Sequence, residues 1–185
     1  MAALSRYRWF LLLALGLAAE GRAAVPDSRW PTEYGVKAAF LYHFARYVEW
    51  PATTASERRQ HFVLVILGQD PFGPVLEKTL EGLVVRERKV VVRRVSRVED
   101  CLDADMVFVS ASEDQHLDNI LARLDGRSIL TVGDSRRFAE RGGMINLRVV
   151  QSRVTFDINP TAAAAAGLTI SSQVLKLAHI VSRTS

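Results

Sequence analysis

The chain has 185 residues, a formal net charge of +4 and hydrophobic residues at 49% of its positions. This length suits one domain with a substantial core. The charge is far below that of a protein with a basic nucleic-acid-binding face, so that class is excluded. Cys101 is the single cysteine in the sequence, which excludes a disulfide within the chain.

The first 24 residues have the three parts of a secretory signal peptide. Arg6 and Arg8 form a positive start, the apolar run 9–17 follows, and small residues come next. The apolar run is too short to cross a bilayer as a helix. We therefore expect residues 1–24 to be removed during export to the periplasm, with cleavage between positions 18 and 24.

The following pattern predicts a helix that Thr32 caps and Trp50-Pro51 ends. One side of this helix is apolar, and the other carries Lys37, His43, Arg46 and Trp50. Strands are then expected at 61–67, 89–95, 106–110 and 128–132, and helices at 74–80, 113–124 and 136–141. Alternating strands and helices predict an α/β domain over 32–183, with a mixed, mainly parallel sheet and flanking helices.

The C-terminal stretch 142–178 predicts a β-hairpin followed by helix. Gly142-Gly143 indicates a turn, and the strands 144–147 and 153–158 are close enough to pair antiparallel. An alanine-rich helix should end near Gly167, where a glycine cap is usual. A second helix should begin at about Ser171.

The arginines around the strand 89–95 and the lone cysteine each allow two interpretations. A basic strand is usually a charged sheet edge that blocks unwanted pairing, and a partner-facing patch is the alternative. Cys101 lies among carboxylates, which disfavour a reactive thiolate. We interpret it as a buried apolar residue, with an intermolecular redox site as the alternative.

No pattern in the sequence calls for catalysis, a metal or a cofactor. The four histidines are far apart and share no metal-ligand spacing. Helix capping accounts for Ser171 and Ser172, and the glycine turn 68–73 lacks the pattern of a phosphate site. We therefore predict that the chain is not an enzyme, has no catalytic or metal-binding residues and needs no cofactor.

Three stretches of the chain resemble the YfiR family of small periplasmic regulators. They are YGVKAAFLYHFARYVEWP at 34–51, LGQDPFG at 67–73, and the run FDIN…AAAGLTISSQVLKLA at 156–178. The resemblance implies a repressor that binds the periplasmic portion of a membrane diguanylate cyclase and controls cyclic-di-GMP signalling and biofilm formation. It also implies an outer-membrane lipoprotein as a second partner, and a homodimer stays open. Some relatives carry cysteine pairs, from which this sequence departs.

The alternative function is a periplasmic small-molecule sensor, a solute-binding module that feeds a kinase or receptor. Open α/β sheets bind ligands at the carboxyl ends of their strands. In this chain those positions are Asp70, Ser110, Gly133 and Asp134.

The expected partner-binding residues come from the first and last of these three stretches. In the strand 153–158, Phe156 alternates inward, so Asp157 should face away from the core, beside the helix start near Ser171. Tryptophan and arginine at the end of the first helix could add a contact, because both are common at binding hot spots. The alternative for Trp50, which the pattern favours, is a capping or packing role. The expected set is Asp157, Asn159, Ser172, Gln173, Arg46 and Trp50. The alternative is that Asp157 pairs with an arginine inside the fold.

Overall fold

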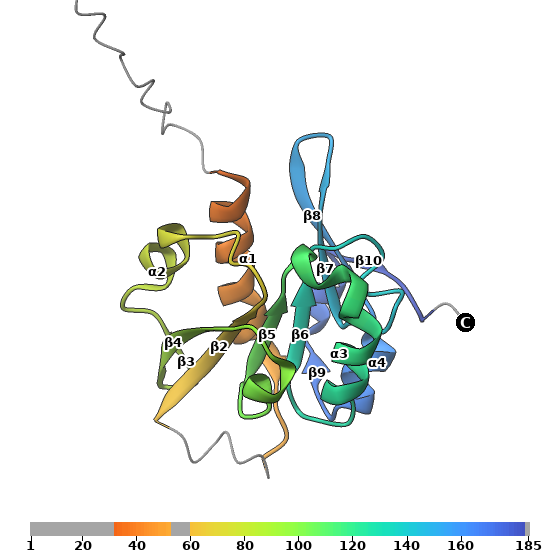
Figure 1. The fold of residues 1–185 in the computed structure, drawn as a ribbon, viewed down its shortest axis with the longest axis horizontal. Coiled ribbons are helices and arrows are strands. Elements are labelled where there is room, and N and C mark those ends of the chain that lie inside the picture. Colours follow the sequence, from red (N-terminus) through yellow and green to blue (C-terminus); the bar gives the residue numbers. More distant parts are fainter. Residues whose placement is uncertain (1–31, 53–59, 184–185) are drawn as a thin grey trace, which may run out of the picture. The chain divides into compact units, whose positions relative to one another are not determined.

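An eight-stranded, mainly parallel sheet carries helices on both faces in the part of the chain that the computed structural model describes, residues 32–52 and 60–183 (Figure 1). The predicted signal peptide, residues 1–24, lies outside the described residues. The helices are α1 (Glu33–Tyr47), α2 (Pro74–Leu80), α3 (Leu117–Leu124), α4 (Pro160–Ala165) and α5 (Ser172–Leu175), with 3₁₀ turns η2 (Val98–Cys101) and η3 (Ala111–His116).

The strand order is β10-β8-β7-β6-β5-β2-β4-β3. Neighbouring strands from β4 to β7 are parallel, β8 is antiparallel to β7, and β10 is parallel to β8. These strands are β2 (His61–Leu67), β3 (Val84–Val85), β4 (Arg88–Val95), β5 (Met106–Val109), β6 (Leu130–Gly133), β7 (Ile145–Val150), β8 (Arg153–Ile158) and β10 (His179–Ile180). A separate pair joins β1 (Val48–Glu49) to β9 (Thr169–Ile170).

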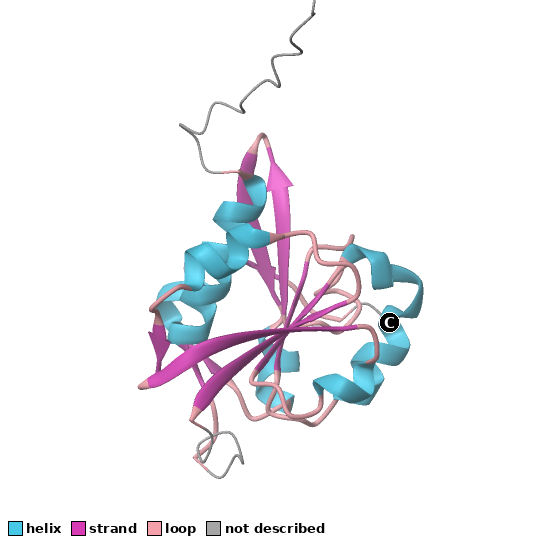
Figure 2. Ribbon diagram, turned by 60° about the vertical axis from the view of Figure 1, so that its left-hand side comes forward, coloured by secondary structure: helices cyan, strands magenta, loops and turns pink. Residues whose placement is uncertain are grey.

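The predicted fold class is confirmed: a mixed, mainly parallel sheet with flanking helices and a C-terminal hairpin plus helix. Figure 2 shows helices on both sides of the strands. One hydrophobic cluster joins the sheet to α1, α2 and α4, through residues such as Phe44, Leu76 and Ala163. A second cluster joins the other face to α3 through Leu117 and Ile120. Because helices cover both faces of the sheet, the central strand β2 consists almost entirely of apolar residues.

Helix α1 begins where the sequence predicts, because the Thr32 hydroxyl accepts a hydrogen bond from the Gly35 amide at 3.1 Å. Its end differs from the prediction of a helix up to Trp50. The helix stops at Tyr47 because the next two residues form β1 and pair with β9. A partner strand more than a hundred residues away therefore decides where the helix ends.

A buried ion pair fastens the first half of α1 to the end of β6. Lys37 Nζ lies 2.8 Å from Asp134 Oδ2 and 2.6 Å from Glu33 Oε1. The Tyr34 hydroxyl donates a hydrogen bond to the same Asp134 oxygen at 3.0 Å. The sequence placed Lys37 on the polar side of the helix, but its side chain is only 4% exposed. It can lie inside because Asp134 compensates its charge.

The segment after β6 is a series of turns where the sequence predicted a helix over 136–141. Arg137 has a φ of 61°, which is incompatible with a right-handed helix. This turn folds the Phe138 ring beneath Gly133 and Gly143, where an added Cβ would lie 2.5 and 2.1 Å from the ring. Close approach of the ring therefore requires glycine at Gly143, whereas the turn itself requires it at Gly142, which has a φ of 112°.

The arginines of β4 are paired with carboxylates. Arg93 contacts Asp103 at 2.5 Å, and Arg94 contacts Asp70 at 2.7 Å and Glu77 at 2.5 Å. On its outer side β4 pairs with only the two residues of β3 among the described residues. These ion pairs argue against the partner-facing patch, because the arginines are already neutralised within the protein.

The predicted hairpin is present, and its strands are longer than expected on the β7 side. Its register runs from Ile145 opposite Ile158 to Val150 opposite Arg153. Both residues of the turn, 151 and 152, have positive φ, as a type I′ turn requires. Beyond it, α4 ends before Gly167, which has a φ of 74° as a glycine cap should.

Candidate partner-binding surface

Three of the six expected partner-binding residues are buried. Trp50, Asp157 and Asn159 are 4%, 5% and 1% exposed. The expectation that Asp157 and Asn159 face away from the core into solvent is therefore wrong, whereas the burial of Trp50 agrees with the packing role considered for it. Asp157 does project away from α1, but β10 lies along β8 at this position and His179 sits beside its carboxylate. The face of a strand that looks polar in the sequence is thus closed by a later segment of the chain.

Each buried residue has partners inside the protein. Asp157 Oδ1 lies 2.6 Å from Arg148 Nη2 and 3.3 Å from His179 Nδ1, which is the arginine pairing considered as the alternative. Asn159 Oδ1 accepts a hydrogen bond from an α4 backbone amide at 3.0 Å and so caps that helix. Trp50 Nε1 donates to a backbone carbonyl of the core, that of Asp105, at 3.3 Å.

The other three, Arg46, Ser172 and Gln173, are exposed. Arg46 belongs to the last turn of α1, and the other two belong to α5. These two helices are neighbours because the Ser171 amide donates to the Tyr47 carbonyl at 2.9 Å. The structure thus brings together the first and last motifs of the sequence. The role of all six residues in binding a partner stays a prediction.

A groove of about 310 Å³ lies between α1, β8 and α5, and we call it the α1–α5 groove. Its lining residues are Phe40, His43, Phe44, Tyr47, Phe156, Gln173, Val174 and Leu177. Its floor is aromatic. The Phe156 ring packs 5.3 Å from the Phe40 ring and 5.1 Å from the Phe44 ring, between centroids. Such packing makes the floor rigid and apolar.

The rim of the groove exposes large apolar side chains. Leu177 is 77% exposed and Tyr47 is 37% exposed. The His43 ring lies nearly parallel to the Tyr47 ring, with 6.4 Å between their centroids. Exposed apolar side chains that gather at a groove mark sites where another molecule binds, since water contact is unfavourable for them.

Two exposed cations belong to the same segments of the chain, although neither lines the groove. Arg46 and Lys176 are exposed, and neither forms an ion pair among the described residues. The Arg46 guanidinium lies over the Tyr42 ring at 5.7 Å, and the Tyr42 hydroxyl donates to the Val84 carbonyl, so Arg46 lies on the β3 side of α1. The apolar lining itself suits an occupant that presents apolar side chains.

Sequence reasoning missed His43, Tyr47 and Leu177 as groove residues. Val174, Leu175 and Leu177 form an apolar stripe in the sequence after Ser171, a pattern that is typical of a helix face packed on the core. The helix stops at Leu175, however, and the chain turns toward β10, which leaves Leu177 outside. Three aromatic residues within one helix, Phe40, Phe44 and Tyr47, were the available signal, but a core stripe gives the same pattern.

The positions considered for a small-molecule sensor are engaged within the protein. The Asp70 carboxylate accepts from the Phe72 amide at 2.7 Å and also binds Arg94. Asp134 holds Lys37, although its Oδ1 is buried and has no hydrogen-bond partner among the described residues. Ser110 is buried at the start of η3. No specific geometry here favours a ligand.

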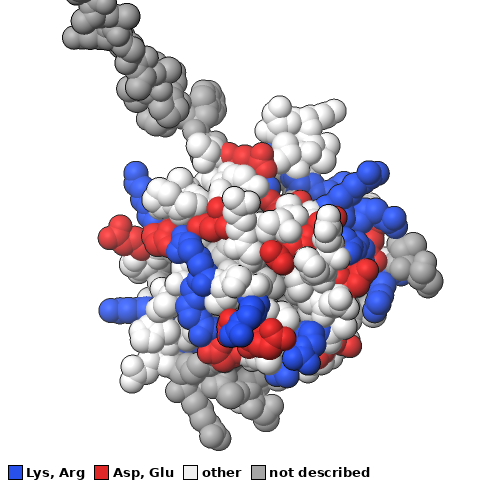
Figure 3. Space-filling view, viewed as in Figure 1, with Lys and Arg blue, Asp and Glu red and all other residues white. Residues whose placement is uncertain are grey.

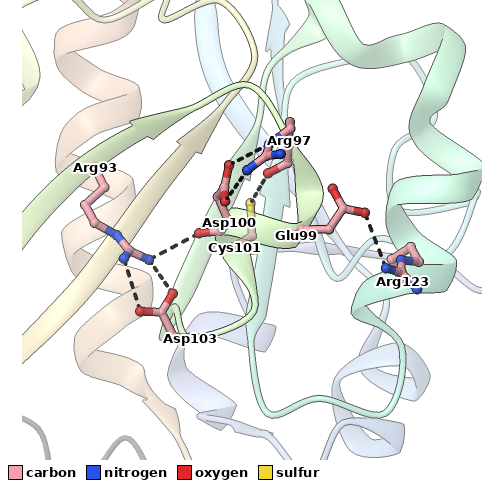
Figure 4. A network of polar contacts seen from close by, with 7 residues as sticks. All are labelled: Arg93, Arg97, Glu99, Asp100, Cys101, Asp103 and Arg123. Atoms are coloured by element: carbon pink, nitrogen blue, oxygen red, sulfur yellow. Dashed lines mark hydrogen bonds and ion pairs between the residues drawn. The ribbon is translucent and has the colours of Figure 1, made fainter.

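Cys101 is fully buried, as expected for an apolar residue. Its thiol lies 3.8 Å from the Arg97 carbonyl, inside a ring of surface ion pairs between arginines and carboxylates (Figure 4). Burial raises the pKa of the Cys101 thiol to about 12, so the protonated, unreactive form dominates near neutral pH. Within residues 32–52 and 60–183, no three His, Cys, Asp or Glu side chains are arranged to hold a metal.

Charged side chains of both signs are mixed on the face drawn in Figure 3. Among the helices in the described residues, none is both long and apolar enough to span a bilayer. An α/β domain with an exposed apolar groove is typical of a protein that binds a partner. The comparisons with known proteins agree with this class.

The chain belongs to the family described as YfiR/HmsC-like, which matches residues 34–179. Membership supports a periplasmic regulatory protein in general. The family is regulatory rather than catalytic. No curated protein sequence matches the chain.

Two solved structures resemble the chain to different degrees. A conserved domain protein from Vibrio cholerae has a TM-score of 0.54 and 12% identity, over 80% of this chain and 60% of its own length. An ABC domain from Streptococcus pneumonia, in complex with L-Trp, has a TM-score of 0.48 and 14% identity, over 64% of this chain and 55% of its own length. The chain therefore spans less than two thirds of either structure, and the first likeness shows the fold alone.

Proposed function

We propose that this chain loses residues 1–24 on export and represses a membrane-bound diguanylate cyclase from the periplasm. Repression would lower cyclic-di-GMP and biofilm formation. The observation that carries the proposal is membership of the YfiR/HmsC-like family over residues 34–179. The exposed α1–α5 groove supports it, because such a regulator needs a surface on which its partner can bind.

The proposal assigns the periplasmic portion of the cyclase to the α1–α5 groove. Apolar side chains of the partner would contact Tyr47 and Leu177 in the groove. Arg46, on the other side of the same helix turn, would add a second contact. Gln173 supplies a polar group at the same edge, and Ser172 lies beside it. These residues are the ones on which affinity should depend.

The three buried residues of the expected set would act indirectly. Trp50 packs against the Phe62 ring at 5.5 Å and supports the chain just after β1. Asp157 holds Arg148 and His179, and Asn159 starts α4. We propose that they shape the groove from behind, so that their substitution lowers stability and binding together.

Repression requires that the protein distinguish two states of the cyclase. A bound protein shifts an equilibrium only by its difference in affinity for the two states. A hundredfold preference for the inactive state corresponds to about 2.7 kcal/mol, which is within the usual range of such couplings. An outer-membrane lipoprotein that binds the same protein would withdraw it from the cyclase and relieve repression.

The test is deletion of the gene in its own organism, with cyclic-di-GMP extracted and quantified. We expect cyclic-di-GMP and biofilm mass to rise, and to return to the original level when the wild-type gene is restored. Unchanged cyclic-di-GMP in the deletion strain, under conditions in which the wild-type protein is detected in the periplasmic fraction, would contradict the proposal.

A further inference from the structure

The outer half of the β7–β8 hairpin extends beyond the rest of the sheet (Figures 1 and 2). β7 pairs with β6 at only its first two residues, and β8 pairs with β10 at only its last two. The remaining residues, 147–150 and 153–156, pair only with each other among the described residues. We call residues 147–156 the hairpin tip.

The hairpin tip has free backbone edges and exposed apolar side chains. Val149 and Val150 are 48% and 43% exposed. Unpaired backbone N–H and C=O groups along a strand edge are a template for another strand. Proteins usually protect such edges with proline, bulges or very short strands. The hairpin has no bulge, because its register is continuous up to the turn.

The hairpin tip is positively charged and contains no carboxylate. Arg148 and Arg153 are both exposed. Arg148 pairs with Asp157, whereas Arg153 forms no ion pair among the described residues. Arg153 is therefore available to a carboxylate from outside the protein.

A hollow of about 510 Å³ lies between the hairpin tip and the first turn of α1. It is lined by Glu33, Val36, Val149, Ser152, Arg153 and Val154. Val149 and Val154 are directly opposite each other in the hairpin register. Together with Val36 they make an apolar wall beside the Arg153 guanidinium, so the hollow suits an apolar side chain next to a carboxylate.

Two other occupants fit less well. A lipid bilayer would leave the free backbone edges without hydrogen bonds, which costs several kcal/mol for each group. A second copy would bring the same arginines together, and four residues per strand fall short of the roughly 1,200 Å² that a stable interface buries. An extended acidic segment would form hydrogen bonds with the free backbone edge and place a carboxylate against Arg153.

We propose that the hairpin tip docks an extended segment of a partner protein as an added strand, with an apolar side chain in the hollow and a carboxylate against Arg153. The inference goes beyond the proposed function. The hollow contacts the first turn of α1, at Glu33 and Val36, whereas the α1–α5 groove uses its second half, from Phe40 to Tyr47. One molecule could therefore hold two segments at once.

The experiment titrates ¹⁵N-labelled mature protein with an acetylated hexapeptide of alternating valine and aspartate, and with a twin in which lysine replaces aspartate. We expect amide shifts confined to residues 147–156 and Val36, and an affinity at least tenfold higher for the aspartate peptide. Arg153→Glu should remove that preference. Arg136→Glu, which changes an exposed arginine on the loop after β6, should leave it intact.

Each remaining outcome would overturn the inference. Shifts centred on the α1–α5 groove, absence of shifts with both peptides, or equal affinity for the two peptides would show that the tip is not a strand-docking site. Anionic phosphatidylglycerol vesicles serve as a second probe. If they perturb the tip in an Arg153-dependent way while the peptide does not, the tip binds membranes instead. None of these outcomes bears on cyclic-di-GMP in the deletion strain.

Discussion

Lys37 is a charged residue inside the fold, and its environment favours the charged form. Burial by itself would lower its pKa, but hydrogen bonds to the Asp134 and Glu33 carboxylates outweigh burial and raise the pKa above the ordinary lysine value. Removing one member of a buried ion pair leaves the other uncompensated. We therefore expect that replacing one member of the pair alone destabilises the protein more than replacing both members with apolar residues.

Replacement of Lys37 alone should be strongly destabilising. We expect Lys37→Met to lower the free energy of unfolding by about 3–5 kcal/mol, because Asp134 stays buried without its cation. The double variant Lys37→Met with Asp134→Leu should recover most of that loss. Urea denaturation of the three proteins measures both values. A single variant as stable as the wild type would show that Asp134 does not depend on Lys37.

The same pair sets a pH dependence at the alkaline end. A lysine pKa that is higher in the folded state stabilises the protein fully below the ordinary lysine value, about 10.4. That stability is lost as the pH rises through the raised pKa of Lys37 in the folded protein. We expect the wild type to lose more stability above about pH 10.4 than the double variant does. If the wild type and the double variant lose equal stability at alkaline pH, the Lys37–Asp134 pair is not the source of the pH dependence.

Cys101 should be inert in the folded protein, because it is buried and its thiol pKa is raised. We expect a thiol reagent such as dithionitrobenzoate to react with it only after denaturant is added. Cys101→Ser should keep repression of the cyclase. Rapid labelling of the native protein, or lost repression with an intact fold, would instead support an intermolecular redox role.

At the scale of elements, the loop between β6 and β7 depends on one close contact. An added Cβ at Gly143 would lie 2.1 Å from the Phe138 ring, so Gly143→Ala should cost about 1–3 kcal/mol through overpacking. With Phe138→Leu already present, the same change should cost less, because the ring is gone. Thermal or urea unfolding of the four proteins gives the coupling. If the stability changes of the two substitutions simply add, the Phe138 ring is not the cause of the Gly143→Ala destabilisation.

Local sequence signals predicted most helices and strands. They failed where contacts with distant parts of the chain determine the local conformation. The apolar run 61–67 and the alternating strand 153–158 were found correctly, because burial imposes those patterns. The predicted helix over 136–141 was wrong because Arg137 adopts a left-handed conformation beside a buried ring. The end of α1 was misplaced because pairing with β9 has no signature near Trp50.

At the scale of the molecule, the sequence predicted the fold class but not how its parts meet. The α1–α5 groove joins residues of the first motif to residues of the last, such as Phe44 and Phe156. No periodicity shows that contact. For the same reason the sequence placed Asp157 and Asn159 at the surface, since it could not show that β10 would lie beside Asp157 or that Asn159 would cap α4 inside the fold.

The central claim is that the α1–α5 groove binds the periplasmic portion of the cyclase. The most direct measurement is calorimetric titration of that portion into the purified mature protein and its variants. Leu177→Asp and Gln173→Arg each change an exposed groove residue. Val84→Asp makes the same apolar-to-acidic change at an exposed valine on β3 that does not line the groove, and is the matched control.

We expect both groove variants to weaken binding at least tenfold while their melting temperatures stay within a few degrees, since surface changes usually alter stability by about 0.5 kcal/mol or less. The Val84 variant should bind as the wild type does. Groove variants that bind the cyclase normally, or that lose binding only in proportion to lost stability, would contradict the account.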